Sequence, residues 1–137
     1  MNRSELQRLS RIRIKEAKLL LDGGCHNGAY YLAGYAVECA LKASIAKQTH
    51  RHDFPDKKRG DDSYTHDLMK LVKVARLENE LQQEIDANVT FRDNWTIVQR
   101  WSEATRYKLF TQDDAAVLYA AIVDEKDAVL SWLRKYW

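Results

Sequence analysis

The sequence contains few of the residues that interrupt helices. It has five glycines and a single proline among 137 residues, so most of the chain carries no strong helix breaker. With 45% hydrophobic and 31% charged residues, this scarcity disfavours both disorder and a strand-and-turn architecture. We therefore expect an all-α protein, and its length fits one domain that spans residues 1–137.

Cysteines are also scarce. Cys25 and Cys39 do not form a CxxC pair, and Cys39 falls in an apolar stretch, where a thiol behaves as a small hydrophobic group. We expect both thiols to be reduced, as is typical of cytoplasmic proteins. The segment MNRSELQRLSRIRIKEAKLL lacks the uninterrupted apolar core of a signal peptide, and no apolar run is long enough to cross a membrane. Secretion and membrane insertion are therefore not expected.

The sequence lacks the motifs of the commonest enzyme classes. It has no glycine-rich phosphate loop, no G-x-S-x-G elbow and no context for a catalytic Cys–His pair. The formal net charge is only +2, from 22 basic and 20 acidic residues, which by itself does not indicate a nucleic-acid-binding protein. Any such role must depend on local clusters of charge.

Hydrophobic spacing predicts helices along most of the chain. A first helix is expected over residues 4–22, ended by Gly23 and Gly24. A second, over residues 27–48, is apolar nearly all round, which is typical of the centre of a bundle. Residues 49–64 concentrate charge and contain the only proline, so we expect a long loop there.

Four further helices are predicted after this loop. We expect one that starts at a Thr65 cap, a short acidic one over residues 78–89, and one that starts at Asp93 or Asn94. The last begins with a capping box of Thr111 and Asp114 and runs to the C-terminus. Aromatic residues at helical spacing, Tyr31, Tyr35, Trp95 and Trp101, are expected to pack in the core.

A charged pair interrupts the second predicted helix. Glu38 and Lys42 lie four residues apart, in the order that favours a helical ion pair. Because apolar residues surround Glu38, its carboxylate would lose hydration that other partners must replace. The candidates are His66, Arg106 and Tyr107.

We therefore predict a polar cluster that holds the bundle together. It contains Glu38, Lys42, His66 and Arg106, and Asp67 is assigned to the same cluster.

Four blocks of sequence carry a family resemblance. AYYLAGYAVECALKA is followed by a polar stretch, and then by YTHDL, NWTIVQRWSEATRY and WLRKYW. In order and spacing these blocks resemble the small stand-alone proteins of the HEPN superfamily over nearly the whole chain. The resemblance implies an up-and-down bundle of four to five helices, often in a homodimer. It also implies a toxin–antitoxin or defence setting, in which such proteins are metal-independent ribonucleases, partners of minimal nucleotidyltransferases or nucleotide-binding domains.

The resemblance also implies a catalytic pair. Catalytic members share an arginine and a histidine separated by four to six residues, and Arg59 and His66 in RGDDSYTH match this spacing. In RNA cleavage a histidine acts as general acid or base, and an arginine stabilises the charged phosphate. Gly60 departs from the polar residue that usually follows the arginine. The alternative is that His66 is structural and hydrogen-bonds to Glu38 or Tyr35.

Several basic residues are candidate ligands of a phosphate group. They are Lys42, Lys57, Lys58, Arg59, His66 and Arg106, with Tyr107 as a hydroxyl donor. A further basic stripe is formed by Arg8, Arg11, Lys15 and Lys18, and it is either a solvated face or a row of phosphate contacts. An acidic patch is formed by Glu78, Glu80, Glu84 and Asp86. His50, His52 and Asp53 lack a recognised metal-ligand spacing, so no metal or other cofactor is expected.

The chain ends in an aromatic cluster. Trp132, Tyr136 and Trp137 come so close together that we do not expect all three to face one core. Exposed members would pack against a partner, since aromatic residues are favoured anchors at interfaces. This favours a homodimer.

The sequence thus leaves three functions open. The first is an RNA- or nucleotide-binding or partner-binding module of a toxin–antitoxin or defence system. The second is a metal-independent endoribonuclease that uses Arg59 and His66. The third is a purely structural adaptor that neutralises or positions a nucleotidyltransferase. A nucleotidyltransferase or an antitoxin is therefore a possible partner of this protein.

Overall fold

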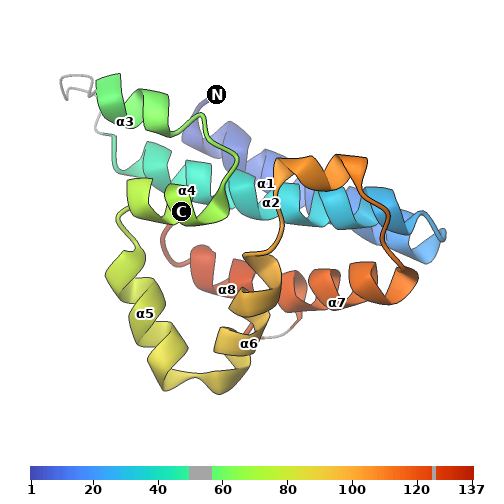
Figure 1. Cartoon of the computed structure of the whole chain (residues 1–137). Helices are drawn as coiled ribbons and strands as arrows, with labels where there is room; N and C mark the ends of the chain where they lie inside the picture. Colours follow the sequence, from blue (N-terminus) through green and yellow to red (C-terminus); the bar gives the residue numbers. More distant parts are fainter. Residues whose placement is uncertain (50–56, 125) are drawn as a thin grey trace.

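The protein is a bundle of helices. A computed structural model describes residues 1–49, 57–124 and 126–137, and every regular element in these ranges is helical (Figure 1). The elements are α1 (Arg3–Asp22), α2 (His26–Lys47), α3 (Lys57–Asp62), α4 (Leu68–Val74), α5 (Glu78–Ala87), α6 (Val89–Val98), the 3₁₀ helix η1 (Glu103–Tyr107), α7 (Gln112–Val123) and α8 (Val129–Leu133). None of these helices is both long and apolar enough to span a membrane.

The first two helices follow the sequence prediction closely. A capping box fixes the start of α1, where Asn2 Oδ1 accepts from the Glu5 amide and Glu5 Oε2 accepts from the Asn2 amide, both at 2.9 Å. The helix ends just before Gly23, and Gly24 has the left-handed φ of 79° that suits glycine. The predicted boundaries of both α1 and α2 are confirmed to within one or two residues.

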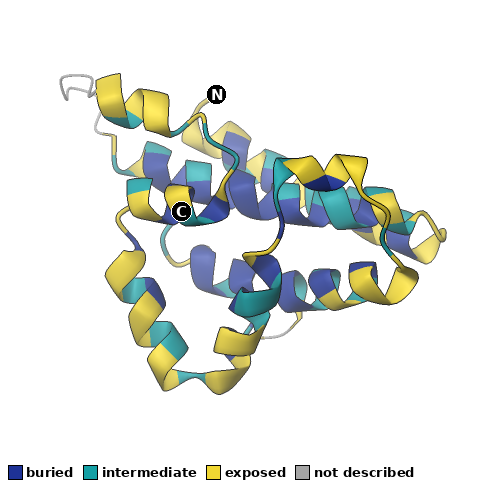
Figure 2. Cartoon of the chain, viewed as in Figure 1, coloured by how far each residue is buried: buried dark blue, intermediate teal, exposed yellow. Residues whose placement is uncertain are grey.

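Helix α2 forms the centre of the bundle. It packs against α1, α7, α4, η1 and α8, and much of it is buried (Figure 2). Its small residues allow this close packing: Ala33, Ala36, Ala40 and Ala43 are fully buried. At Gly34, a Cβ atom would overlap the ring of Trp101. Because glycine has no side chain, the indole of Trp101 can pack directly against α2.

The predicted loop over residues 49–64 is partly wrong. Lys57–Asp62 form the short helix α3, which packs against α4. The segment of this loop that holds His50, His52 and Asp53 lies outside the described residues.

The predicted starts of the middle helices also need correction. Asp67, not Thr65, caps α4 by accepting a hydrogen bond from the Lys70 amide at 3.0 Å. Asn88, not Asp93 or Asn94, caps α6 by accepting from the Phe91 amide at 3.0 Å. Helix α6 therefore begins at a position where the sequence pattern predicted only the end of the preceding helix.

The last predicted helix is broken into two. The capping box of Thr111 and Asp114 is confirmed, but α7 ends at Val123 and α8 starts at Val129. Helix α6 holds the connection: the side-chain amide of Asn88 donates to Asp127 Oδ1 at 2.8 Å, and that of Asn94 donates to the Asp127 carbonyl at 3.1 Å. These contacts between distant segments stabilise the break.

The aromatic residues at the end of the chain pack within it. Trp132 and Trp137 are buried, and Tyr136 packs against the same core. Trp132 contacts the ring of Phe91, with centroids 5.4 Å apart. The prediction that some of these residues would be exposed or contact a partner is therefore wrong for the two tryptophans. These aromatic residues therefore no longer support a homodimer.

The two cysteines are free and differ in environment. Cys25 is exposed and Cys39 is buried in α2. Burial, with a smaller contribution from the nearby charge of Glu38, raises the pKa of the Cys39 thiol to about 12. This thiol therefore stays protonated at neutral pH and is a packing residue rather than a nucleophile.

Candidate functional site: the His66 cluster

The charged pair of α2 lies at the edge of the core. Glu38 is only 2% exposed, and its Oε1 atom is 2.9 Å from Lys42 Nζ, one helical turn further on. Lys42 reaches the surface, with 21% of its side chain exposed. Because a buried carboxylate needs partners to replace water, one partly exposed lysine does not satisfy Glu38 alone.

His66 supplies the second partner. Its Nδ1 atom lies 2.8 Å from the same Glu38 Oε1, and 41% of the side chain is exposed. Its other nitrogen, Nε2, lies 3.1 Å from Glu103 Oε2 in η1. The residue stands just before Asp67, the cap of α4, so the start of that helix positions the ring between α2 and η1.

Glu103 also contacts an arginine. Its other oxygen, Oε1, is 2.9 Å from a guanidinium nitrogen of Arg106. The Arg106 guanidinium also lies 4.9 Å from the ring centroid of Tyr107, whose side chain is exposed. The element η1 thus presents a carboxylate, a guanidinium and a phenol next to His66.

These contacts make one continuous group, which we call the His66 cluster. It consists of Lys42, Glu38, His66, Glu103 and Arg106, in that spatial order. The structure brings together four of the five residues that were expected to form a polar cluster, all but Asp67. Sequence reasoning missed Glu103, although its spacing of three from Arg106 is a signal for a helical ion pair.

The geometry around His66 has a chemical consequence. Ionised carboxylates only accept hydrogen bonds, whereas a neutral imidazole donates from one nitrogen alone. The Nδ1 contact with Glu38 is a hydrogen bond, and the 3.1 Å contact of Nε2 with Glu103 is an attractive ion pair only when the imidazole is protonated. When the ring is neutral, one of the two contacts is released, and the more exposed one is that to Glu103.

Arg59 lies in a different set of contacts from His66. Its guanidinium donates to the Val74 carbonyl at 3.0 Å and also contacts the side chain of Gln48. These contacts join α3 to the ends of α2 and α4. The geometry of this chain thus does not bring the Arg59 guanidinium to the ring of His66, and the catalytic pair stays a prediction from the resemblance.

The remaining predicted site residues lie outside the His66 cluster. Lys57 and Lys58 are exposed on α3. Asp67 is exposed and serves as the cap of α4, so it was wrongly grouped with Glu38. Tyr107 adjoins the cluster through Arg106.

The basic stripe lies on the exposed side of α1. Part of it is engaged locally: Lys18 pairs with Asp22 at 3.0 Å, and the Arg11 guanidinium lies 4.9 Å from the ring of Trp137. Arg8 and Lys15 are exposed. The stripe is therefore a mixture of packing contacts and solvated charge.

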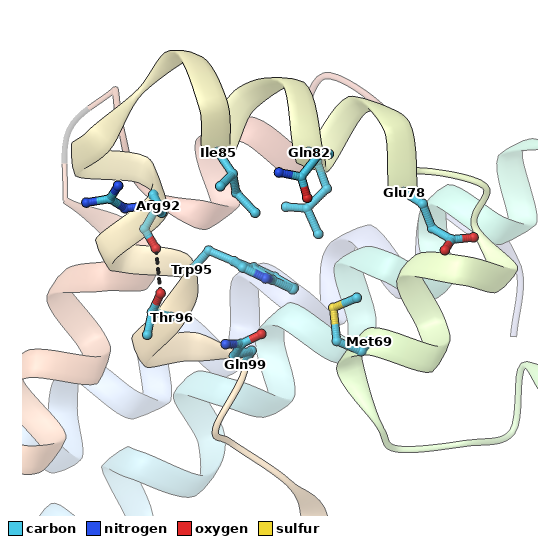
Figure 3. A pocket seen from close by; sticks show the side chains of 9 residues that line it. Met69, Glu78, Gln82, Ile85, Arg92, Trp95, Thr96 and Gln99 are labelled. Atoms are coloured by element: carbon cyan, nitrogen blue, oxygen red, sulfur yellow. Dashed lines mark hydrogen bonds between the residues drawn. The ribbon is translucent and has the colours of Figure 1, made fainter.

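A separate pocket of about 330 Å³ opens between α4, α5 and α6 (Figure 3). Met69, Ile85 and Trp95 supply apolar wall, and Gln82 and Gln99 supply amide groups. The residues predicted to bind phosphate are absent from its described lining, so it is distinct from the His66 cluster.

No arrangement of His, Cys, Asp and Glu suited to a metal ion occurs within residues 1–49, 57–124 and 126–137. Comparisons with protein families, curated proteins and solved structures found no match to this chain. The geometry of the His66 cluster and the sequence blocks are therefore the observations that bear on function.

Proposed function

We propose that this protein is a cytoplasmic HEPN-like module that binds the phosphate groups of RNA or nucleotides at the His66 cluster. The observation that carries the proposal is the position of His66, held by buried Glu38 and flanked at the surface by Lys42 and Arg106. Lysine and arginine are the usual ligands of phosphate, and arginine offers a planar pair of donors. The exposed ring of Tyr107 beside Arg106 is a surface on which a base can stack.

The resemblance to the HEPN superfamily supplies the wider setting. On this proposal α1, α2, α6 and α7 are the helices of an up-and-down bundle, and the remaining helices are additions to it. The order of the sequence blocks supports this assignment, as does the packing of α1 and α7 on α2 and of α6 on α7. We further propose a homodimer in a toxin–antitoxin or defence system, with a minimal nucleotidyltransferase or another antitoxin as partner.

The experiment is binding of a fluorescein-labelled uridine dodecamer RNA, followed by fluorescence polarisation. Arg106→Gln and Lys42→Gln should each weaken binding by roughly threefold to tenfold. Each should also reduce the slope of log affinity against log salt by about 0.7, the value for one phosphate contact on a single strand. Arg92→Gln, an exposed arginine on α6, is the control and should bind like the wild type.

Circular dichroism must accompany Lys42→Gln, because this change leaves Glu38 without its lysine. Arg106 is exposed, so Arg106→Gln keeps the test independent of folding. If both variants are folded and bind RNA as tightly as the wild type, the proposal is wrong.

One feature also favours a second function, the endoribonuclease. His66 is oriented through Nδ1 by a buried carboxylate, while Nε2 contacts the partly exposed Glu103, and a ring oriented in this way by a carboxylate is the arrangement of a general base. A neutral ring would take the proton of a ribose 2′-hydroxyl as that oxygen attacks the adjacent phosphorus. The bond from phosphorus to the 5′-oxygen then breaks, and this oxygen takes a proton from the His66 imidazolium or from water, which leaves a 2′,3′-cyclic phosphate and a 5′-hydroxyl. Arg59, or Arg106 next to Glu103, would stabilise the charged phosphate.

The same RNA distinguishes the two functions when it is incubated with protein and chelator and separated on a gel. A binding module leaves the RNA intact. Cleavage by the wild type that disappears in folded His66→Gln would establish the ribonuclease instead.

A further inference from the structure

The carboxylate of Glu103 occupies an unusual position within the His66 cluster. One of its oxygens lies 3.1 Å from His66 Nε2 and the other 2.9 Å from an Arg106 nitrogen. A single carboxylate thus bridges an imidazole and a guanidinium. Phosphate oxygens are bound by the same two kinds of donor, in the same bridging manner.

The donors on either side of Glu103 do not depend on it for their placement. His66 is fixed from its other nitrogen by Glu38, which is 2% exposed and also paired with Lys42. Arg106 lies against the ring of Tyr107. If the Glu103 side chain rotated away, an imidazole and a guanidinium would remain on either side of the position that its carboxylate had filled.

Glu103 and Arg106 lie on the same short element, so the Glu103 carboxylate leaves the site by rotation of its own side chain. The 3₁₀ helix η1 has five residues, and its N-cap, Ser102, makes no side-chain capping bond. Glu103 itself is 33% exposed. Of the η1 residues only Thr105 is buried, and its hydroxyl donates to the Ser102 carbonyl at 2.7 Å. A short 3₁₀ turn of this kind has poorer hydrogen-bond geometry than an α-helix.

From this geometry we infer that Glu103 is an internal occupant of an oxyanion site formed by His66 and Arg106. The inference rests on the proposed function, because it assigns the same cluster a phosphate as its ligand. The phosphate of an RNA strand displaces the Glu103 carboxylate and takes over its two donors. Glu103 therefore lowers the affinity of the free site and selects ligands that offer further contacts.

Local charge supports this assignment. Without His66, the cluster contains two basic side chains, Lys42 and Arg106, and two acidic ones, Glu38 and Glu103. Their formal charges cancel, which gives little attraction for an anion. Removal of the Glu103 charge leaves a net charge of +1, and protonation of His66 adds to it.

The test compares wild type with Glu103→Gln, using the labelled uridine dodecamer and, separately, inorganic phosphate as a competitor. Glu103→Gln should bind the RNA roughly threefold to tenfold more tightly and should release it at lower phosphate concentration. Glu80→Gln raises the net charge by the same amount from α5 and should leave affinity unchanged. Adding Arg106→Gln to Glu103→Gln should abolish the gain in RNA affinity. That result would show that the guanidinium of Arg106 is the donor that Glu103→Gln releases.

The outcomes separate this inference from the proposed function. Binding by the wild type that is not tightened in folded Glu103→Gln overturns the role of Glu103 and leaves phosphate binding at the cluster intact. Equal gains in Glu103→Gln and Glu80→Gln also overturn it, since they show an effect of net charge alone. RNA binding by neither the wild type nor Glu103→Gln overturns both proposals.

Discussion

Gly34→Ala should destabilise the protein by about 2–3 kcal/mol, at the upper end of the usual cost of overpacking a core. A Cβ atom at this position would overlap three atoms of the Trp101 ring. Trp101 is 2% exposed, so its indole has no free space into which to move. The measurement is the free energy of unfolding in urea.

Two comparisons isolate the contact between Gly34 and Trp101. Gly28→Ala lies in the same helix but would meet only the end of the Leu20 side chain, at 3.1 Å. It should leave stability unchanged or raise it by less than about 1 kcal/mol. In a Trp101→Leu background, Gly34→Ala should cost much less than in the wild type, because the overlapping ring is gone. An equal cost in both backgrounds would show that the indole is not the cause.

Glu38→Gln should lower stability by about 1–3 kcal/mol, the range for hydrogen bonds that involve charged groups. The buried carboxylate accepts a hydrogen bond from His66 and forms an ion pair with Lys42, whereas an amide is uncharged and its oxygen is a weaker acceptor. Because both partners are partly exposed, the loss should be smaller than for a fully buried pair. Differential scanning calorimetry should show a melting temperature lower by roughly 4–12 °C.

The control for Glu38→Gln is Glu80→Gln, an equal change of charge on α5. It should alter the melting temperature by less than about 2 °C. An unchanged melting temperature for Glu38→Gln would show that the carboxylate does not hold the bundle together. The His66 cluster would then be a surface feature with no structural role.

The sequence was a good guide where one helix could be read by itself. The boundaries of α1 and α2 follow from glycines and from hydrophobic spacing, and the capping box of α7 from Thr111 and Asp114. The buried charge of Glu38 also indicated partners from elsewhere in the chain. His66 was among these candidates because the stranded carboxylate called for a donor.

Features that depend on contacts between distant segments could not be predicted. The break after Val123 has no glycine or proline to mark it, and the side chains that stabilise it, Asn88 and Asn94, come from the N-cap and the body of α6. Helix α3 has no apolar residue to give a periodic signal. The role of Glu103 depends on η1 lying beside α2 (Figure 1), and nothing in its local sequence points to His66.

The central claim is that phosphate binds at the His66 cluster. The most direct test follows the nuclear magnetic resonance signals of the His66 imidazole nitrogens during titration with the uridine dodecamer. The account predicts that the Nε2 signal shifts as RNA binds, since its partner changes from Glu103 to a phosphate oxygen. The Nδ1 signal should change less, because Glu38 keeps its contact. RNA binding that leaves both His66 signals and the Arg106 guanidinium signal unmoved would contradict the account and place the RNA elsewhere on the protein.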